Sequence, residues 1–193
     1  MKGKKRETIL NTAKQMFRRY GIRKTNLDEI ARMAKVAKAT IYNYFGSKEQ
    51  VYFEVLNREA TEFIDKISEA VAQINPPLDK LRVFYRTRFS KMKEASNILN
   101  IYGDGSEHLM AKTSGIRERI FKKEISLVQS ILEEGVKQGV FRMDNIFRTA
   151  RVIGYTFNGL EASFPADRSN EEMEADFEGL FDVLCRGILV EKK

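Results

Sequence analysis

The sequence has few of the residues that build covalent, metal or redox sites. Its 193 residues include one cysteine and one histidine, so an internal disulfide is excluded and no His and Cys cluster for a metal is available. No apolar run approaches the ~18 residues of a membrane span. The basic N-terminus is not followed by the apolar stretch of a secretory signal. These absences predict a soluble, cytoplasmic protein without a metal or other cofactor.

Charge is distributed unevenly along the chain. Residues 1–50 carry 13 Lys and Arg against four Asp and Glu, a net charge of +9, whereas the whole chain carries only +7. The positive excess therefore lies in the first quarter of the sequence. A basic segment joined to a nearly neutral remainder predicts a phosphate-binding module on a body with another role.

Residues 25–50 have the pattern of two short helices joined by a tight turn, followed by the start of a third. We expect Asn26 to cap the first helix and residues 35–37 to form the turn. The second helix is predicted over 38–45, with Gly46 ending it and Ser47 capping a long helix that ends at Pro76-Pro77. A preceding helix should end at Gly21. This layout is that of a helix-turn-helix, which places its second helix in the major groove of DNA.

The rest of the chain predicts only helices, because apolar residues recur at helical spacing and no strand-like alternation competes. The expected segments are helices over 78–92, 98–102, 116–139, 146–160 and 173–188, a polar connection over 103–115 and a break over 165–170. The predicted fold is all-α. It comprises an N-terminal three-helix DNA-binding domain, residues 1–48, and a C-terminal helical bundle for ligand binding and dimerisation, residues 49–193.

The residues around YNYFGSKEQ are similar to a known family signature. The similar positions are Thr25, Ile30, Ala31, Ala34, Thr40, Ile41, Tyr42, Tyr44, Phe45, Ser47, Lys48 and Glu49. They resemble the N-terminal signature of the tetracycline-repressor (TetR/AcrR) family over roughly residues 5–56. The stretch from Glu133 to Phe141 also resembles the end of the helix that precedes the last two helices in that family. The resemblance implies a homodimeric repressor whose C-terminal domain binds a small effector and then releases the operator.

The turn departs from the family pattern at three positions. Lys35, Ala37 and Ala39 stand where many members have Gly, Ser and Gly. Because alanine has no side-chain acceptor, Ala37 cannot cap the second helix of the motif, and we expect that helix start to be weak.

Three residues of the motif are candidate phosphate contacts. Lys48 stands at the first position of a capped helix, where a bound phosphate would contact both its ammonium and the helix N–H groups. Tyr42 lies on the outward face of its helix, where its hydroxyl either donates to a phosphate or the ring packs against Lys and Arg stems. Thr25 is either a phosphate ligand or a turn residue.

Four residues on the outward face of the second helix are candidate base readers: Lys38, Ala39, Thr40 and Asn43. Lys suits guanine acceptors, Asn pairs with adenine, and Ala or the Thr methyl suits the thymine methyl. Asn43 could instead contact only phosphate. The basic residues at positions 2, 4, 5 and 6 form either an arm that reaches DNA or a solvated tail.

Aromatic, methionine and polar residues of the body are candidates for an effector pocket: Phe84, Phe89, Tyr102, Met110, Phe121, Tyr155 and Asn158. The alternative is that the apolar ones form core and that Asn158, like Arg151, is exposed. Small residues at Ala150, Gly154, Asn158 and Ala162 form a ridge that would let another helix approach closely, in a partner subunit or in the same one. Cys185 is expected to be a buried core thiol.

These features favour a ligand-responsive, DNA-binding transcriptional regulator, most simply a repressor released from a palindromic operator by an apolar or amphipathic effector. Its predicted partners are double-stranded DNA, a second copy of the chain and that effector, with no membrane. The alternative is a constitutive DNA-organising protein with no effector. No enzyme is predicted, because neither a nucleophile–base pair nor a Gly-rich phosphate loop is present.

Overall fold

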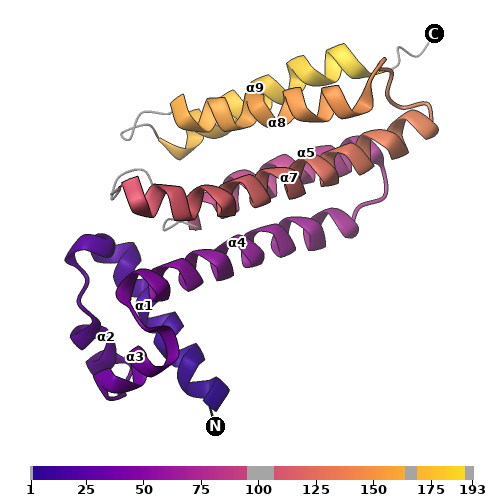
Figure 1. Ribbon diagram of the computed structural model, residues 1–193. Helices are drawn as coiled ribbons and strands as arrows, with labels where there is room; N and C mark the ends of the chain where they lie inside the picture. Colours follow the sequence, from indigo (N-terminus) through magenta and orange to yellow (C-terminus); the bar gives the residue numbers. More distant parts are fainter. Residues whose placement is uncertain (1, 95–106, 164–168, 190–193) are drawn as a thin grey trace. The chain divides into compact units, whose positions relative to one another are not determined.

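The computed structural model describes residues 2–94, 107–163 and 169–189 (Figure 1). In these ranges all regular structure is helical, apart from one isolated bridge between Phe141 and Leu189. The helices are α1 (Lys2–Lys24), α2 (Leu27–Met33), α3 (Lys38–Phe45), α4 (Lys48–Ala72), α5 (Pro77–Glu94), α7 (Glu107–Lys137), α8 (Ile146–Ser163) and α9 (Asn170–Ile188). The predicted all-α fold is confirmed. Within the described ranges, none of the helices has the length and apolarity needed to span a lipid bilayer.

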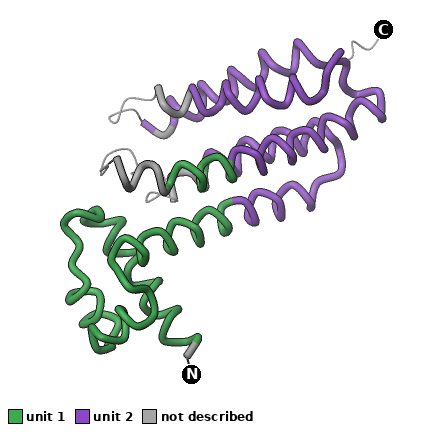
Figure 2. Tube along the Cα trace, viewed as in Figure 1, with its two compact units in different colours: residues 1–63, 90–120 green, residues 64–89, 121–193 purple. Residues whose placement is uncertain are grey.

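The chain forms two compact units, coloured separately in Figure 2. Unit 1 contains residues 1–63 and 90–120, and unit 2 contains residues 64–89 and 121–193. Both α4 and α7 contribute residues to the two units, so neither unit is one continuous stretch of chain. The predicted domain boundary after residue 48 stays a prediction.

Unit 1 has a core built from one apolar stripe on each of α1 to α4. The Phe17 ring of α1 meets the Tyr52 ring of α4 edge-on, with centroids 5.0 Å apart. Other side chains with no exposed surface are Ile9, Ala13, Ile30, Ile41 and Leu56. Because every helix of the motif contributes to this core, the faces that remain outside are fixed in direction.

Gly46 ends α3 as predicted, and Gly21 interrupts α1 at its predicted end, although α1 continues to Lys24. Gly21 has φ 73° and ψ 166° and breaks the helical path of α1, after which the chain winds on to Lys24. Gly46 ends α3 with φ 79°. Both glycines adopt the positive φ that other residues reach only at a cost.

The polar connection predicted over residues 103–115 is wrong for its second half, because α7 begins at Glu107 and includes Gly115. A glycine inside a helix costs roughly 1 kcal/mol relative to alanine. Thr113 and Ile116 beside it are fully buried, and this packing offsets that cost. Residues 103–106 and the helix predicted over 98–102 lie outside the described residues.

Unit 2 has an aromatic core contributed by α5, α8 and α9. The rings of Tyr85 and Phe157 stack with centroids 3.8 Å apart, and the rings of Phe157 and Phe177 stack with centroids 5.3 Å apart. α7 ends at Lys137, close to the predicted end, and Gly139 follows at φ 72°. α8 extends to Ser163, beyond the predicted end at 160, and α9 begins at Asn170, before the predicted start at 173. Cys185 is buried as predicted, and burial raises the pKa of its thiol to about 11.

The close of α7 depends on a second glycine. The Phe141 ring lies directly over Gly135, where an added Cβ would come within 2.0 Å of the ring. Any larger residue at position 135 would displace Phe141, which is buried. This contact fixes the turn that leads from α7 into α8.

Candidate nucleic-acid interface

The turn between α2 and α3 is held by backbone hydrogen bonds. Val36 N–H donates to the Ala31 carbonyl at 3.0 Å, and Lys35 N–H donates to the Arg32 carbonyl at 3.2 Å. Lys35 has φ 54°, a left-handed conformation that is costly for a residue with a side chain. Lysine therefore occupies a position for which glycine, the residue of many family members, is better suited.

The two helices of the motif begin differently. The side chain of Asn26 caps α2, as predicted, by accepting a hydrogen bond from Asp28 N–H at 3.0 Å. Ala37 precedes α3 in an extended conformation and offers no side-chain cap. The prediction of an uncapped α3 is confirmed, so its first N–H groups have no side-chain acceptor from Ala37.

The side chains of α3 divide into an inner and an outer face. Ile41 and Phe45 are buried, whereas Lys38, Ala39, Tyr42 and Asn43 are exposed and Thr40 is half-buried. The candidate base readers and Tyr42 thus lie on the side of α3 that is turned away from the core. This arrangement leaves donors, acceptors and methyl groups available to a partner.

Lys38 has an intramolecular partner on α2. Its Nζ donates to Asp28 Oδ2 at 2.9 Å and lies 6.0 Å from the centroid of the Tyr42 ring. The hydrogen bond to Asp28 raises the pKa of Lys38. The lysine is therefore charged, and contact with DNA requires it to share or exchange that carboxylate.

Lys48 and Thr25, separated by 23 positions in the sequence, are brought together. Lys48 Nζ donates to the Thr25 carbonyl at 3.2 Å, and Ser47 Oγ caps the start of α4 by accepting from Gln50 N–H at 3.1 Å. The Thr25 hydroxyl is buried and donates to the Gly21 carbonyl at 2.7 Å. That hydroxyl is used inside the protein, which favours the turn-residue alternative for Thr25.

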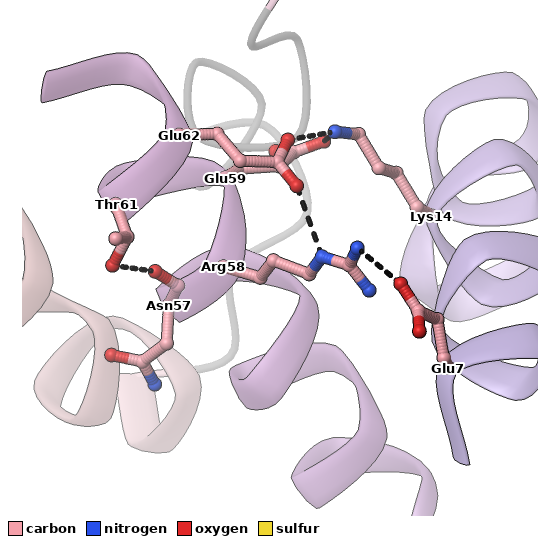
Figure 3. Close-up of polar contacts among 7 residues, drawn as sticks. All are labelled: Glu7, Lys14, Asn57, Arg58, Glu59, Thr61 and Glu62. Carbon is pink, nitrogen blue, oxygen red and sulfur yellow. Dashed lines mark hydrogen bonds and ion pairs between the residues drawn. The ribbon is translucent and has the colours of Figure 1, made fainter. Parts of the chain in front are cut away.

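Polar side chains tie α1 to α4 within unit 1 (Figure 3). Arg58 of α4 donates to Glu7 at 3.1 Å and to Glu62 at 3.0 Å. Lys14 of α1 donates to Glu62 at 2.8 Å and lies 4.0 Å from the carboxylate of Glu59. Although burial opposes the change, the hydrogen bonds from Lys14 and Arg58 lower the pKa of Glu62. These pairs join α4 to α1, against which α2 packs. They could not be predicted from the sequence, because their members are far apart along the chain.

The basic residues at the N-terminus do not form an extended arm. Lys2, Lys4, Lys5 and Arg6 all belong to α1. Arg6 forms an ion pair with Glu54 of α4, and its guanidinium lies 5.5 Å from the centroid of the Phe45 ring. Of the two alternatives left open for these residues, an arm and a solvated tail, the extended arm is not observed, because they belong to a helix.

The candidate effector residues lie in different environments of unit 2. Phe84 is buried, Phe89 lies 4.3 Å from Phe177, and Phe121 lies 5.0 Å from the Tyr155 ring, which is exposed. Arg151 is exposed, which agrees with the predicted alternative to a place in the effector pocket. Its guanidinium lies over the Phe147 and Tyr155 rings. Tyr102 and the Met110 side chain lie outside the described part of the structure.

A buried ion pair in unit 2 was missed by sequence reasoning. Arg88 of α5 donates through Nε to Glu124 of α7 at 2.6 Å and through a second nitrogen to Asn158 of α8 at 2.5 Å. The side chains of Arg88 and Glu124 are only 3% and 6% exposed. Arg and Glu are common on the exposed faces of helices, so two such residues 36 positions apart do not indicate a buried ion pair in the sequence.

The ridge of small residues on α8 faces the interior of unit 2. Ala150 is fully buried, a Cβ on Gly154 would lie 3.0 Å from the Phe121 ring, and Asn158 accepts from Arg88. The sequence left open whether this ridge packs against the same subunit or a partner, and the structure shows it packed against helices of the same subunit. The Ala162 side chain lies outside the described residues. A different surface is exposed and apolar: Phe147, Val152 and Tyr155 of α8 and Val183 of α9.

Two family models together match most of the chain. One, for bacterial regulatory proteins of the tetR family, matches residues 9–55, and the other, for the C-terminal region of a YsiA-like protein, matches residues 56–159. The second match alone covers more than half of the sequence.

The two relatives described next are less than 30% identical to the chain. The chain is 27% identical over 143 residues to the uncharacterized HTH-type transcriptional regulator YhgD of Bacillus subtilis, covering 72% of each protein. It is 28% identical over 144 residues to the HTH-type transcriptional repressor KstR2 of Rhodococcus jostii, covering 74% of this chain and 71% of the relative. A solved transcriptional regulator from Cytophaga hutchinsonii has the same fold, with a TM-score of 0.80 at 22% identity, covering 95% of this chain and 98% of that one.

Proposed function

The chain belongs to the tetR family of bacterial regulatory proteins, and we propose that it is a transcriptional repressor that a small effector releases from a palindromic operator. The observation that carries this proposal is the exposed outer face of α3, held in place by the buried Ile41 and Phe45. A helix positioned in this way presents base-reading side chains to the major groove. The repressor KstR2 among the relatives supports repression over activation.

The proposed DNA contacts divide into base readers and phosphate binders. Lys38, Ala39, Thr40 and Asn43 read bases from the exposed face of α3. Tyr42 and Lys48 bind phosphates, Lys48 at the N-terminus of α4, where the helix N–H groups also favour an anion. Thr25 positions Lys48 through its carbonyl.

The proposed dimer surface is the exposed apolar face of α8 and α9. Phe147, Val152 and Tyr155 recur along one side of α8, and Val183 is the most exposed of the large apolar side chains, at 68%. Gly179 and Gly187 flank Val183 with open space above them, which lets a second helix approach closely. A two-fold pairing of this surface matches the symmetry of a palindromic operator.

The effector acts by binding more tightly to the conformation of the dimer that does not fit the operator than to the conformation that does. An effector that favours a state with the two DNA-binding heads at the wrong spacing lowers operator affinity by that difference in affinity. Of the predicted effector residues, Phe84, Phe89, Phe121 and Asn158 remain candidates, as do Tyr102 and Met110, whereas the exposed Tyr155 is assigned to the dimer surface. The aromatic character of this set suits an apolar or amphipathic molecule.

Repression of bacterial genes places the protein in the cytoplasm, where the chromosome lies, and requires no catalytic activity. The relatives named above are transcriptional regulators rather than enzymes. A constitutive DNA-organising role is not favoured, because a repressor stands among the relatives over most of the chain.

The test is selection of random double-stranded DNA by the purified protein, followed by sequencing of the recovered fragments. We expect a palindromic motif whose half-sites lie about one helical turn, or a multiple of it, apart. Recovery without a motif, combined with steep salt dependence, would instead indicate backbone binding alone and favour the DNA-organising role.

A further inference from the structure

A polar cluster lies inside unit 2, formed by Arg88 of α5, Glu124 of α7 and Asn158 of α8. Tyr85 stands three positions before Arg88 on α5, and the charges of Arg88 and Glu124 both act on its hydroxyl. Arg88 binds both Glu124 and Asn158, so the charged members of the cluster are paired. Tyr85 differs, because its hydroxyl is buried and has no hydrogen-bond partner among the described residues. A buried hydroxyl without a partner is destabilising and calls for an explanation.

The ring of Tyr85 is buried and packs against three other aromatic rings. Phe157 stacks on it at 3.8 Å, and Phe84 and Phe181 meet it edge-on at 5.0 Å and 6.0 Å. These rings form an apolar frame around the Tyr85 ring, and its hydroxyl is the donor of this frame that has no partner. Such a frame suits a flat or cyclic apolar molecule that carries one hydrogen-bonding atom.

The charges in the cluster decide what that atom is. Arg88 and Glu124 balance each other, and both are desolvated. A ligand with its own charge would leave an unbalanced charge in this interior, which is strongly unfavourable. An uncharged oxygen adds no charge and supplies the acceptor that Tyr85 lacks. Burial also raises the pKa of Glu124 despite its pairing with Arg88, as expected where water is excluded.

We propose that the polar cluster is the recognition point of the effector, and that Tyr85 donates a hydrogen bond to an uncharged oxygen of an otherwise apolar, ring-containing molecule. This inference rests on the proposed function, because it names the chemical class of the effector. The aromatic neighbours provide contact area, and the Tyr85 hydroxyl provides selectivity for an oxygen-bearing ligand over the corresponding hydrocarbon.

The experiment measures binding of four matched probes to the full-length protein in the absence of DNA. The probes are 2-acetylnaphthalene, 2-ethylnaphthalene, 2-naphthoate and 2-naphthylmethylammonium, which share one ring system and differ in the polar group. The wild type is expected to bind 2-acetylnaphthalene at least tenfold more tightly than 2-ethylnaphthalene. In Tyr85→Phe this ratio should fall to near one, while binding of the hydrocarbon is retained.

Tyr85→Phe keeps the ring and removes only the partnerless hydroxyl, so the variant should melt at the wild-type temperature or above it. The control is Tyr52→Phe, which removes a hydroxyl from a buried tyrosine of unit 1 and should leave the ratio unchanged. Loss of the ratio in both variants would overturn the assignment to Tyr85.

Four other results would overturn the proposal. They are equal binding of ketone and hydrocarbon by the wild type, a ratio that survives Tyr85→Phe, tightest binding by the carboxylate or the ammonium, and binding of none of the four probes. Operator binding by the same proteins is measured separately. Wild-type protein that binds no DNA would refute the repressor function, whereas a failed probe series with intact operator binding would refute only this inference.

Discussion

Helices α3 and α8 each pack one face inside the protein, but they expose opposite kinds of side chain. The outer face of α3 carries Lys38, Tyr42 and Asn43, whereas that of α8 carries Phe147 and Val152. Exposed basic and amide groups suit phosphates and base edges, and exposed apolar side chains suit another protein surface.

The buried faces of α3 and α8 also differ in chemical character. α3 buries only apolar side chains, whereas α8 turns Asn158 toward the buried pair of Arg88 and Glu124. The comparison teaches that both the exposed and the buried side of a helix must be read before a partner is assigned to it.

The largest expected effect comes from breaking the buried pair behind α8. Arg88→Ala leaves Glu124 buried without its cation and should lower the free energy of unfolding by about 3–5 kcal/mol. Arg86→Ala is the control, since Arg86 is exposed on the same helix and pairs with Glu178; it should cost about 1 kcal/mol or less. Urea denaturation measures both. Equal losses in the two variants would show that the buried pair has no special role.

The exposed face of α8 is tested by a charge. Val152→Glu places two carboxylates in the proposed two-fold interface and should weaken dimerisation by about 3 kcal/mol. Sedimentation over a concentration series measures this. Ser126→Glu adds the same charge to an exposed position of α7 and should leave the dimer intact. A Val152→Glu protein that dimerises like the wild type would remove this face from the interface.

The start of α3 offers a gain in stability. Ala37→Ser supplies the missing N-cap acceptor and should raise the free energy of unfolding by about 1 kcal/mol. The substitution lies before the reading face, so operator sequence preference should persist. Thermal unfolding measures the change in stability, and selection of random DNA by the variant measures its sequence preference. A decrease in melting temperature would mean that the extended conformation of Ala37 does not permit capping.

A smaller gain is expected at the turn. Lys35→Gly relieves the left-handed backbone at φ 54°, but glycine also gains freedom in the unfolded chain. The net stabilisation should be about 0.5 kcal/mol, since these two terms oppose each other. Lys35→Ala serves as the control because it removes the same charge without relieving the backbone. Equal stability of the two variants would contradict this reading of the turn.

Sequence reasoning succeeded where structure is decided locally. The cap at Asn26, the helix breaks at Gly21 and Gly46 and the extent of α3 were all predicted, because each depends on a few neighbouring residues. The exposed face of α3 followed from helical periodicity alone. The roles of its residues in DNA contact stay predictions.

Sequence reasoning failed where structure depends on distant partners. The helical state of residues 107–115 depends on burial of Thr113. The pairing of Arg88 with Glu124 was not predicted, and the partner of the Ala150 to Asn158 ridge was left open, because both depend on how helices pack. Periodicity identifies a face of a helix but does not say which neighbour covers it.

The most direct test compares Asn43→Ala with Lys48→Ala on the selected operator and on a scrambled duplex of the same composition, between 50 and 200 mM salt. Asn43→Ala should reduce the ratio of the two affinities by roughly 1–3 kcal/mol of discrimination in each half-site and leave the salt slope unchanged. Lys48→Ala removes one phosphate contact from each subunit of the dimer, so it should weaken both duplexes alike and reduce the slope by about 1.8. Equal weakening of both duplexes by Asn43→Ala, or unchanged binding in Lys48→Ala, would contradict the division between a reading face on α3 and a phosphate contact at the start of α4.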